Sequence, residues 1–286
     1  MKKIFALLIA LTLLLSITAC GSNKLTMRTI IEANQIDKLL EANDSVSILG
    51  TMNGEPYIEY YFTKDCAYEK GTGWAMYLTD DAGYICSNGQ YGRLVFIAED
   101  GLGSAAEYRA GRHKDVLVSQ NSLKEKIQTI EETGDRIVVT STMDPKTVSE
   151  VIEEEGVQSY NAEYVVDAKT YGMITARGIL TAEDGTTVDG IMACSYNVEM
   201  PEEAKIQAEY LAQTEDLRTV TLVFHAGTEK EKAETVQAIK GHAISLTQMP
   251  ESVGSMSLYA DAACTEAYAS NGDYTSDVTI YVKWNS

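Results

Sequence analysis

The chain has 286 residues, of which 42 are Asp or Glu and 23 are Lys or Arg, so its formal net charge is −19. This acidic balance excludes a general nucleic-acid-binding protein, because little positive charge is available to neutralise a run of phosphates. Hydrophobic residues make up 45% of the chain, which excludes wholesale disorder. The length suggests about two domains.

The N-terminus has the pattern of a secretion signal. Met1-Lys2-Lys3 is basic, and residues 4–15 are apolar except for Thr12. This apolar stretch is shorter than the roughly 20 residues of an ordinary membrane-spanning helix, and it fits the apolar region of a signal peptide. Residues 16–22 then read Ser-Ile-Thr-Ala-Cys-Gly-Ser, with small residues before a cysteine.

Residues 17–20 resemble the lipobox of bacterial lipoproteins. The resemblance implies that residues 1–19 are a removed signal peptide, that Cys20 carries a diacylglyceryl group, and that residues 20–24 are a lipidated tether. Two buried acyl chains anchor a protein stably, whereas one is marginal. The expected location is therefore extracytoplasmic, anchored by lipid to the cell membrane at the surface of a Gram-positive-type envelope. The alternative is an ordinary secretory signal in which the cysteine is incidental.

The residues after the tether predict an α+β fold. Apolar residues at helical spacing predict one amphipathic helix over residues 25–42, and Gly-containing turns separate short strands between residues 45 and 99. Next the sequence predicts a helix at 122–132, a strand at 136–142, a helix from Asp144-Pro145 to Glu155, strands at 159–167, 171–182 and 187–199, and a helix at 202–212. After residue 217 the pattern restarts, with a strand at 219–224, a charged helical segment at 229–240 and two short strands near the end.

Residues 217–286 resemble the internalin B-repeat, also called the Listeria–Bacteroides repeat, of Gram-positive surface proteins. The resemblance is carried by residues 220–224, residues 261–265 and the closing SDVTIYVKW of residues 276–284. It implies a small β-grasp-like domain of the kind found in stalks and adhesive proteins. The family's Gly-Trp-Tyr is Ser257-Leu258-Tyr259 in this chain, so one packing Trp is missing.

Residues 25–212 resemble the LolA/LppX lipoprotein-carrier fold. The resemblance is carried by a first helix before a long antiparallel sheet, by residues 164–170 followed by Ile174, and by Val198-Glu199-Met200-Pro201. It implies a half-barrel sheet whose concave side is filled or covered by helices and binds acyl chains. The expected architecture is thus an N-terminal antiparallel, half-barrel-like sheet with covering helices, followed by a small C-terminal β-grasp-like domain.

No pattern of catalytic residues is present in the sequence. It contains no Gly-x-Ser-x-Gly elbow, no His-Glu-x-x-His helix and no Walker loop. His113, His225 and His242 lie in separate segments without metal-ligand spacing. We therefore expect no enzyme, no cofactor and no dedicated metal site.

The main candidate ligand surface is an apolar face of the predicted sheet. Its residues, mostly at alternate strand positions, are Ile58, Tyr60, Phe62, Trp74, Met76, Leu78, Leu94, Phe96, Met192 and Tyr196. One interpretation is a cavity for a hydrophobic ligand. The alternative is a core covered by the helix of residues 25–42, because any half-buried sheet has such a face.

A basic cluster lies in the irregular segment of residues 100–120. It consists of Arg109, Arg112, His113 and Lys114. Functionally, it predicts contact with an anion such as a phosphate headgroup or an anionic wall polymer. The alternative is an exposed loop that balances local acidic residues.

Four cysteines remain after Cys20. Cys66 and Cys86 lie in the same sheet-forming region, so they are the candidate disulfide, and an extracytoplasmic location permits one. The alternative is that these two, like Cys194 and Cys264, are free thiols.

Together these patterns predict a membrane-anchored surface lipoprotein that acts as a non-catalytic binding module for a lipid or other apolar ligand. The alternative is a structural or adhesive surface protein without a ligand cavity. The expected partners are the membrane, through the lipid anchor, an apolar ligand, and an envelope or surface protein or glycan, but no nucleic acid.

Overall fold

The computed structural model describes residues 25–95, 105–110, 114, 116–246, 255–268 and 276–285. Its helices are α2 (Met27–Ala33), α3 (Ile36–Ala42), α4 (Ala105–Ala110), α5 (Pro145–Ile152) and α6 (Glu202–Ala212), with a 3₁₀ turn η2 (Gln120–Lys124). The strands before α6 are β1 (Val46–Met52), β2 (Glu55–Phe62), β3 (Ala67–Gly71), β4 (Trp74–Leu78), β5 (Gly83–Ser87), β6 (Gln90–Val95), β7 (Lys126–Thr133), β8 (Arg136–Met143), β9 (Val157–Asp167), β10 (Met173–Ala182) and β11 (Thr187–Tyr196). The strands after α6 are β12 (Leu217–Phe224), β13 (Lys232–Ile239), β14 (Ala243–Leu246), β15 (Ser255–Tyr259) and β16 (Val278–Asn285).

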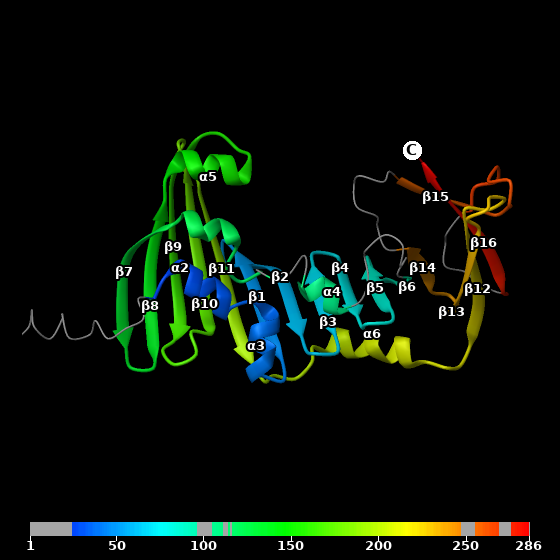
Figure 1. Ribbon diagram of the computed structural model, residues 1–286, viewed down its shortest axis with the longest axis horizontal. Helices are drawn as coiled ribbons and strands as arrows, with labels where there is room; N and C mark the ends of the chain where they lie inside the picture. The colour runs from blue at the N-terminus through cyan, green and yellow to red at the C-terminus, as the bar shows by residue number, and fades with distance from the viewer. Residues whose placement is uncertain are drawn as a thin grey trace, which may run out of the picture.

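Twelve strands form one large open sheet (Figure 1). Their order is β14-β6-β5-β4-β3-β2-β1-β11-β10-β9-β8-β7, and all neighbours are antiparallel except β14 and β6, which are parallel. The outermost strands, β14 and β7, do not pair with each other, so the sheet is open and is not a closed barrel. The predicted antiparallel sheet with covering helices is confirmed at this level.

Asn-Gly pairs make two of the hairpins of this sheet. Asn53 and Gly54 join β1 to β2 with φ values of 52° and 85°, and Asn88 and Gly89 join β5 to β6 with φ values of 49° and 78°. Positive φ at both central residues defines the two-residue turn whose twist matches antiparallel strands, and Asn-Gly is the pair that adopts it at least cost. The hairpins predicted from these dipeptides are therefore formed.

The helix predicted over residues 25–42 is two helices, α2 and α3, that meet at Asn34. The Asn34 side chain is buried, and its Nδ2 donates to the carbonyl oxygens of Ile30 at 2.8 Å and Tyr171 at 2.9 Å. Its Oδ1 accepts from the backbone N–H of Met173 at 2.6 Å. Asn34 thus ends α2 while it binds the turn between β9 and β10, so a tertiary contact breaks the helix that the apolar spacing predicted.

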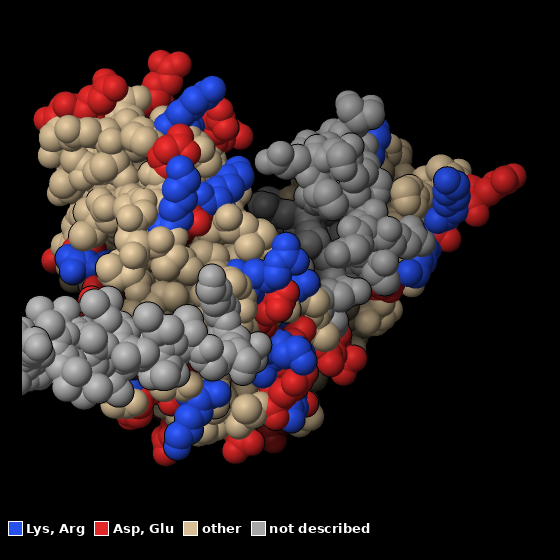
Figure 2. All heavy atoms as spheres, turned by 60° about the vertical axis from the view of Figure 1, so that its left-hand side comes forward, with Lys and Arg blue, Asp and Glu red and all other residues tan. Residues whose placement is uncertain are grey.

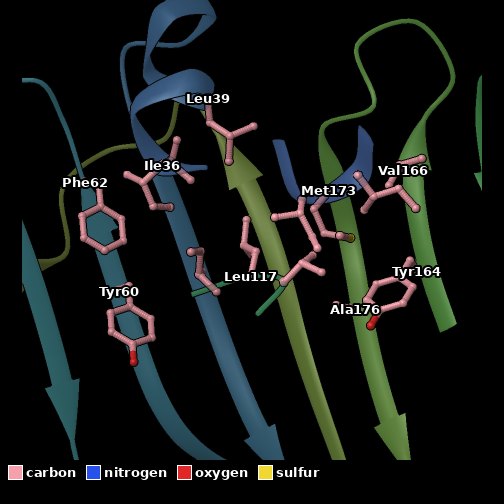
Figure 3. Close-up of a cluster of buried hydrophobic side chains, with 14 of the residues drawn as sticks. Ile36, Leu39, Tyr60, Phe62, Leu117, Tyr164, Val166, Met173 and Ala176 are labelled. Carbon is pink, nitrogen blue, oxygen red and sulfur yellow. The ribbon is translucent and has the colours of Figure 1, made fainter. Parts of the chain in front are cut away.

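The main core lies between α2, α3 and one face of the sheet, which we call the inner face (Figure 3). Ile36 and Leu39 of α3 point toward side chains that project from several strands, among them Phe62 of β2 and Met173 of β10. Leu117, from the segment before η2, fills the space between them. Burial of these side chains holds the two short helices on the sheet, since helices of seven residues are not stable alone.

The opposite face, which we call the outer face, is covered by α6 near β3 and β4. Tyr61 and Tyr68 pack there with Ala204 of α6 in a second cluster. Pro201 precedes this helix, and its bounds of 202 and 212 are those predicted from the sequence. Helix α5 also begins as predicted, because Asp144 caps it by accepting a hydrogen bond from the Thr147 N–H at 3.0 Å.

Two segments predicted to be helical are strands. Residues 122–132 form the end of η2 and most of β7, and residues 229–240 contain β13. In β7, Gln128 is an extra residue in the pairing with β8, which is a β-bulge. Because of the bulge, Ile127 and Ile130 lie on one face of the strand although they are three residues apart, a spacing that is typical of a helix. In β13, Val236 and Ala238 alternate with more exposed residues, but the charges at residues 229–232 obscure that period in the sequence.

The C-terminal region contributes to two sheets. Four strands form a small sheet in the order β13-β12-β16-β15, with β12 and β16 parallel. Its core contains Val220, Leu222 and Ile280. Strand β14, although it follows β13 in the chain, does not join the small sheet and pairs with β6 of the large one. The described residues after Ala212 contain no helix. The small sheet lies in the region predicted for the second domain, and its β-grasp-like arrangement stays a prediction.

Aromatic residues join α6, the large sheet and the start of β14. His242 Nδ1 lies 2.6 Å from the Tyr84 hydroxyl, and its ring contacts Tyr210 edge-on at 4.7 Å between centroids and stacks on Tyr91 at 5.9 Å. Burial raises the pKa of Tyr84 well above its usual value, so its hydroxyl stays protonated at neutral pH. Burial lowers the pKa of His242 below 6.5.

We expect this junction to weaken in acid. The unfolded chain takes up the His242 proton first, near pH 6.5, because its pKa there is higher than in the folded protein. The contribution of His242 to stability is therefore present above pH 6.5 and is lost as the pH falls through the lowered folded-state pKa. Melting temperatures at pH 7.5 and pH 5 should differ less for His242→Gln than for the natural chain. Equal differences would contradict the assignment.

Candidate functional site

An open groove lies between the start of α2 and the edge strand β7. Its volume is about 550 Å³, and it is lined by Leu25, Thr26, Met27, Arg28, Leu123, Glu125, Ile127 and Ile130. Ligand pockets in proteins measure roughly 300–1,000 Å³, so the groove is large enough for a small ligand. Leu123 is 44% exposed and Ile130 is 45% exposed, which places large apolar side chains in contact with water here.

The β-bulge in β7 builds one wall of this groove. Ile127 pairs with Ser141 and Ile130 pairs with Val139, and both of these β8 residues are buried on the inner face. Without the extra residue Gln128, side chains three positions apart would point to opposite faces of the strand. The bulge therefore turns both isoleucines toward α2 and gives the groove its apolar side.

Buried hydroxyl groups bind the carboxylate of Glu125, the residue directly before β7. The Tyr164 hydroxyl donates to both Glu125 carboxylate oxygens, at 2.8 and 3.0 Å, and the Ser141 hydroxyl donates to Oε2. Burial and then the charge of Glu125 raise the pKa of Tyr164 far above its usual value and that of Tyr160 to about 12. These phenols stay protonated at neutral pH. The hydroxyl groups thus donate hydrogen bonds to a buried carboxylate and fix the start of β7.

The apolar face predicted as a ligand surface is mostly core. Tyr60, Phe62, Leu78 and Leu94 are buried in the inner-face cluster together with residues of α2 and α3. The partly buried residues packed against this cluster include Ile58, Met76, Met192 and Tyr196. Trp74 is half-buried and its indole lies over Gly71, while Phe96 is outside the described residues. The described structure thus agrees with the alternative of a core covered by helices, and the groove lies at the other end of the sheet.

The basic cluster is divided between buried and exposed positions. Arg109 of α4 is 6% exposed, its Nη2 donates to the Lys64 carbonyl oxygen at 2.8 Å, and its Nε lies 3.6 Å from Asp37 Oδ1. Lys114 is exposed, and its carbonyl oxygen accepts from the Ile36 N–H. Arg112 and His113 lie outside the described residues. The hollow beside Arg109 is lined by acidic Asp37 and Glu41 as well as by basic Lys64, so neither sign of charge dominates there. Contact with an anion remains a prediction.

The candidate disulfide is not formed. Cys66 and Cys86, like Cys194 and Cys264, are free thiols. Cys66 directly precedes β3 and Cys86 lies on β5, with β4 between these two strands. Two strand spacings separate residues by roughly 10 Å, which exceeds the roughly 4–7 Å between Cα atoms that a disulfide spans. The sheet order, which the sequence left open, therefore prevents the pairing.

No cluster of three potential metal-ligating side chains occurs among the described residues. Within the same residues, no helix is both long enough and apolar enough to span a membrane.

No protein-family model and no curated protein sequence matches the chain. Among solved structures, it is similar to LprF from Mycobacterium bovis, with 12% identity over 63% of this chain and 97% of that one and a TM-score of 0.33. It is also similar to MucB, with 12% identity over 62% and 59% of the two chains and a TM-score of 0.29. A LolA superfamily protein from Nitrosomonas europaea shows 12% identity over 63% and 96%, with a TM-score of 0.21.

Proposed function

We propose that this chain is a non-catalytic binding module of the bacterial envelope, and that the groove between α2 and β7 binds the acyl chain of a lipid or a comparable apolar ligand. The observation that carries the proposal is the groove itself, because Leu123 and Ile130 remain exposed in it although a filled core is available on the same face of the sheet. Exposed apolar surface of this kind marks binding sites. Arg28 at the same groove supplies a cation for an anionic headgroup.

Ile130→Glu should abolish binding without unfolding the protein. A carboxylate in the groove makes insertion of an acyl chain unfavourable, so we expect at least about a tenfold loss of bound lipid. The full chain is purified from a bacterial host, extracted with organic solvent, and the non-covalent lipid is quantified by mass spectrometry. Ile152→Glu is the matched control, because Ile152 is 39% exposed on α5 and lies away from the groove. Extraction without lipid from the natural chain, or equal recovery from Ile130→Glu, would contradict the proposal.

The anchor is a separate part of the proposal. Cys20 lies outside the described residues, and the lipobox resemblance supports its lipidation. Replacement of Cys20 by Ala removes the thiol that receives the diacylglyceryl group, so the protein should move from the membrane fraction to the medium. Immunoblots of the two fractions measure this, and retention of Cys20→Ala at the membrane would exclude the lipid anchor.

A structural or adhesive role is the second candidate function. The filled core on the inner face favours it, because most of the surface predicted for ligand is occupied by α2, α3 and Leu117. The C-terminal resemblance to an adhesive surface repeat points the same way. Absence of lipid from the natural chain would leave this role as the better description.

A further inference from the structure

Strand β7 is the free edge of the large sheet. It pairs with β8 on one side, and no described strand pairs with its other side. Its eight residues are exposed except Ile127, which is half-buried. Figure 2 turns the left-hand side of Figure 1, where β7 lies, toward the viewer, and uncharged residues cover much of that side. An edge of this length can pair with another strand through its backbone N–H and C=O groups.

The bulge sorts the side chains of β7 into two rows. Ile127 and Ile130 belong to the inner-face row, as their partners Ser141 and Val139 do. Lys126 pairs with Thr142 and Glu131 pairs with Val138, so both belong to the outer-face row. Each row therefore contains one residue before the bulge and one after it. The two are three positions apart in the inner-face row and five positions apart in the outer-face row.

The side chains in each row of one β7 strand are complementary to those in the same row of a second, antiparallel β7 strand. In an antiparallel pair of two β7 strands centred between Gln128 and Thr129, Lys126 of one copy lies opposite Glu131 of the other, on the outer face. Ile127 then lies opposite Ile130 on the inner face. A two-fold axis repeats each contact, so two ion pairs and two apolar pairs form. Directly opposed side chains in antiparallel strands interact in this way.

We propose that a second copy of this chain pairs with β7 in this register and joins the two large sheets edge to edge. The occupant is a second copy because β7 itself has the required order of charges, basic before the bulge and acidic after it. Lys126 and Glu131 make no ion pair with another described residue, so both are available. The pairing also brings the two lipid grooves next to each other, but it does not require that either groove binds lipid.

The test uses two differently tagged full-length copies expressed together and solubilised in mild detergent. Copies of the natural chain should co-purify. When both copies carry Lys126→Glu, or both carry Glu131→Lys, every ion pair becomes a repulsive pair, and we expect about a ten- to hundredfold loss of co-purification. When one copy carries Lys126→Glu and the other carries Glu131→Lys, opposite charges face each other at both positions again. Co-purification should then return to the natural level.

Control variants reverse the exposed ion pair of α3, a helix whose main contacts are with α2, α4 and β1. Lys38→Glu and Glu41→Lys make the same changes of charge there, and co-purification should stay at the natural level in every combination. Failure of natural copies to associate would overturn the proposal, and so would association that ignores the charge of residues 126 and 131. Lipid recovery from the same samples is measured separately, so loss of the dimer and loss of lipid binding are distinguishable.

Discussion

Asn34→Leu should lower the free energy of unfolding by about 2–5 kcal/mol, because it leaves one buried and one partly buried backbone group without partners. The Met173 N–H and the Tyr171 carbonyl oxygen both bond to the Asn34 side chain. Leucine has nearly the same size but neither donates nor accepts. The break between α2 and α3 and the turn before β10 would both lose the contact that joins them.

Urea unfolding of the two proteins measures this difference. Asn43→Leu is the matched control, because Asn43 also donates its side-chain N–H to a carbonyl of the preceding helix, that of Leu39 at 2.9 Å, but at a partly exposed site. That substitution should cost less than about 1 kcal/mol. Equal losses from the two variants would show that Asn34 does not bind the β9–β10 turn.

Phe62→Ala should lower the free energy of unfolding by about 3–5 kcal/mol while lipid recovery per folded chain stays unchanged. Phe62 is fully buried, stacks on Tyr60 with ring centroids 5.9 Å apart, and lies against the residues of α3. Its loss leaves a cavity in the core. This result would separate the core from the groove, where Ile130→Glu reduces lipid binding and leaves stability nearly unchanged.

The reverse pattern would identify the predicted apolar face as the ligand site. If Phe62→Ala reduced lipid recovery and left the urea midpoint in place, the side chain would contact ligand and not the helices. Ile130→Ala serves as the stability control, since Ile130 is 45% exposed and its truncation removes little buried area.

Much of the fold could be predicted because its signals are local. Pro201 before Glu202, Asp144 before Pro145 and the two Asn-Gly pairs act within a few residues of themselves, and the structure forms each element there. The expectation that Ile58, Tyr60 and Phe62 share one face of the strand is confirmed, since alternate strand residues point to the same side.

The candidate site could not be predicted in the same way. The segment with Ile127 and Ile130 is predicted to be helical because these residues are three positions apart, and only the pairing with β8 reveals the bulge at Gln128 that puts them on one face of a strand. The sequence left open whether the helical segment of residues 25–42 covers Tyr60 and Phe62, and it contained no signal that Leu123 stays exposed. Burial depends on which distant segments pack together, and composition does not encode that.

Composition and local patterns were enough to predict an acidic chain that folds into an antiparallel sheet with covering helices, and the lipobox resemblance stays a prediction. The free edge at β7, the pairing of β14 with β6 and the filling of the predicted ligand face depend on tertiary contacts. The physical reason is the range of the forces. Caps, turns and strand alternation arise from neighbours in sequence, whereas a groove or an edge remains only where no distant segment of the described chain comes to cover it.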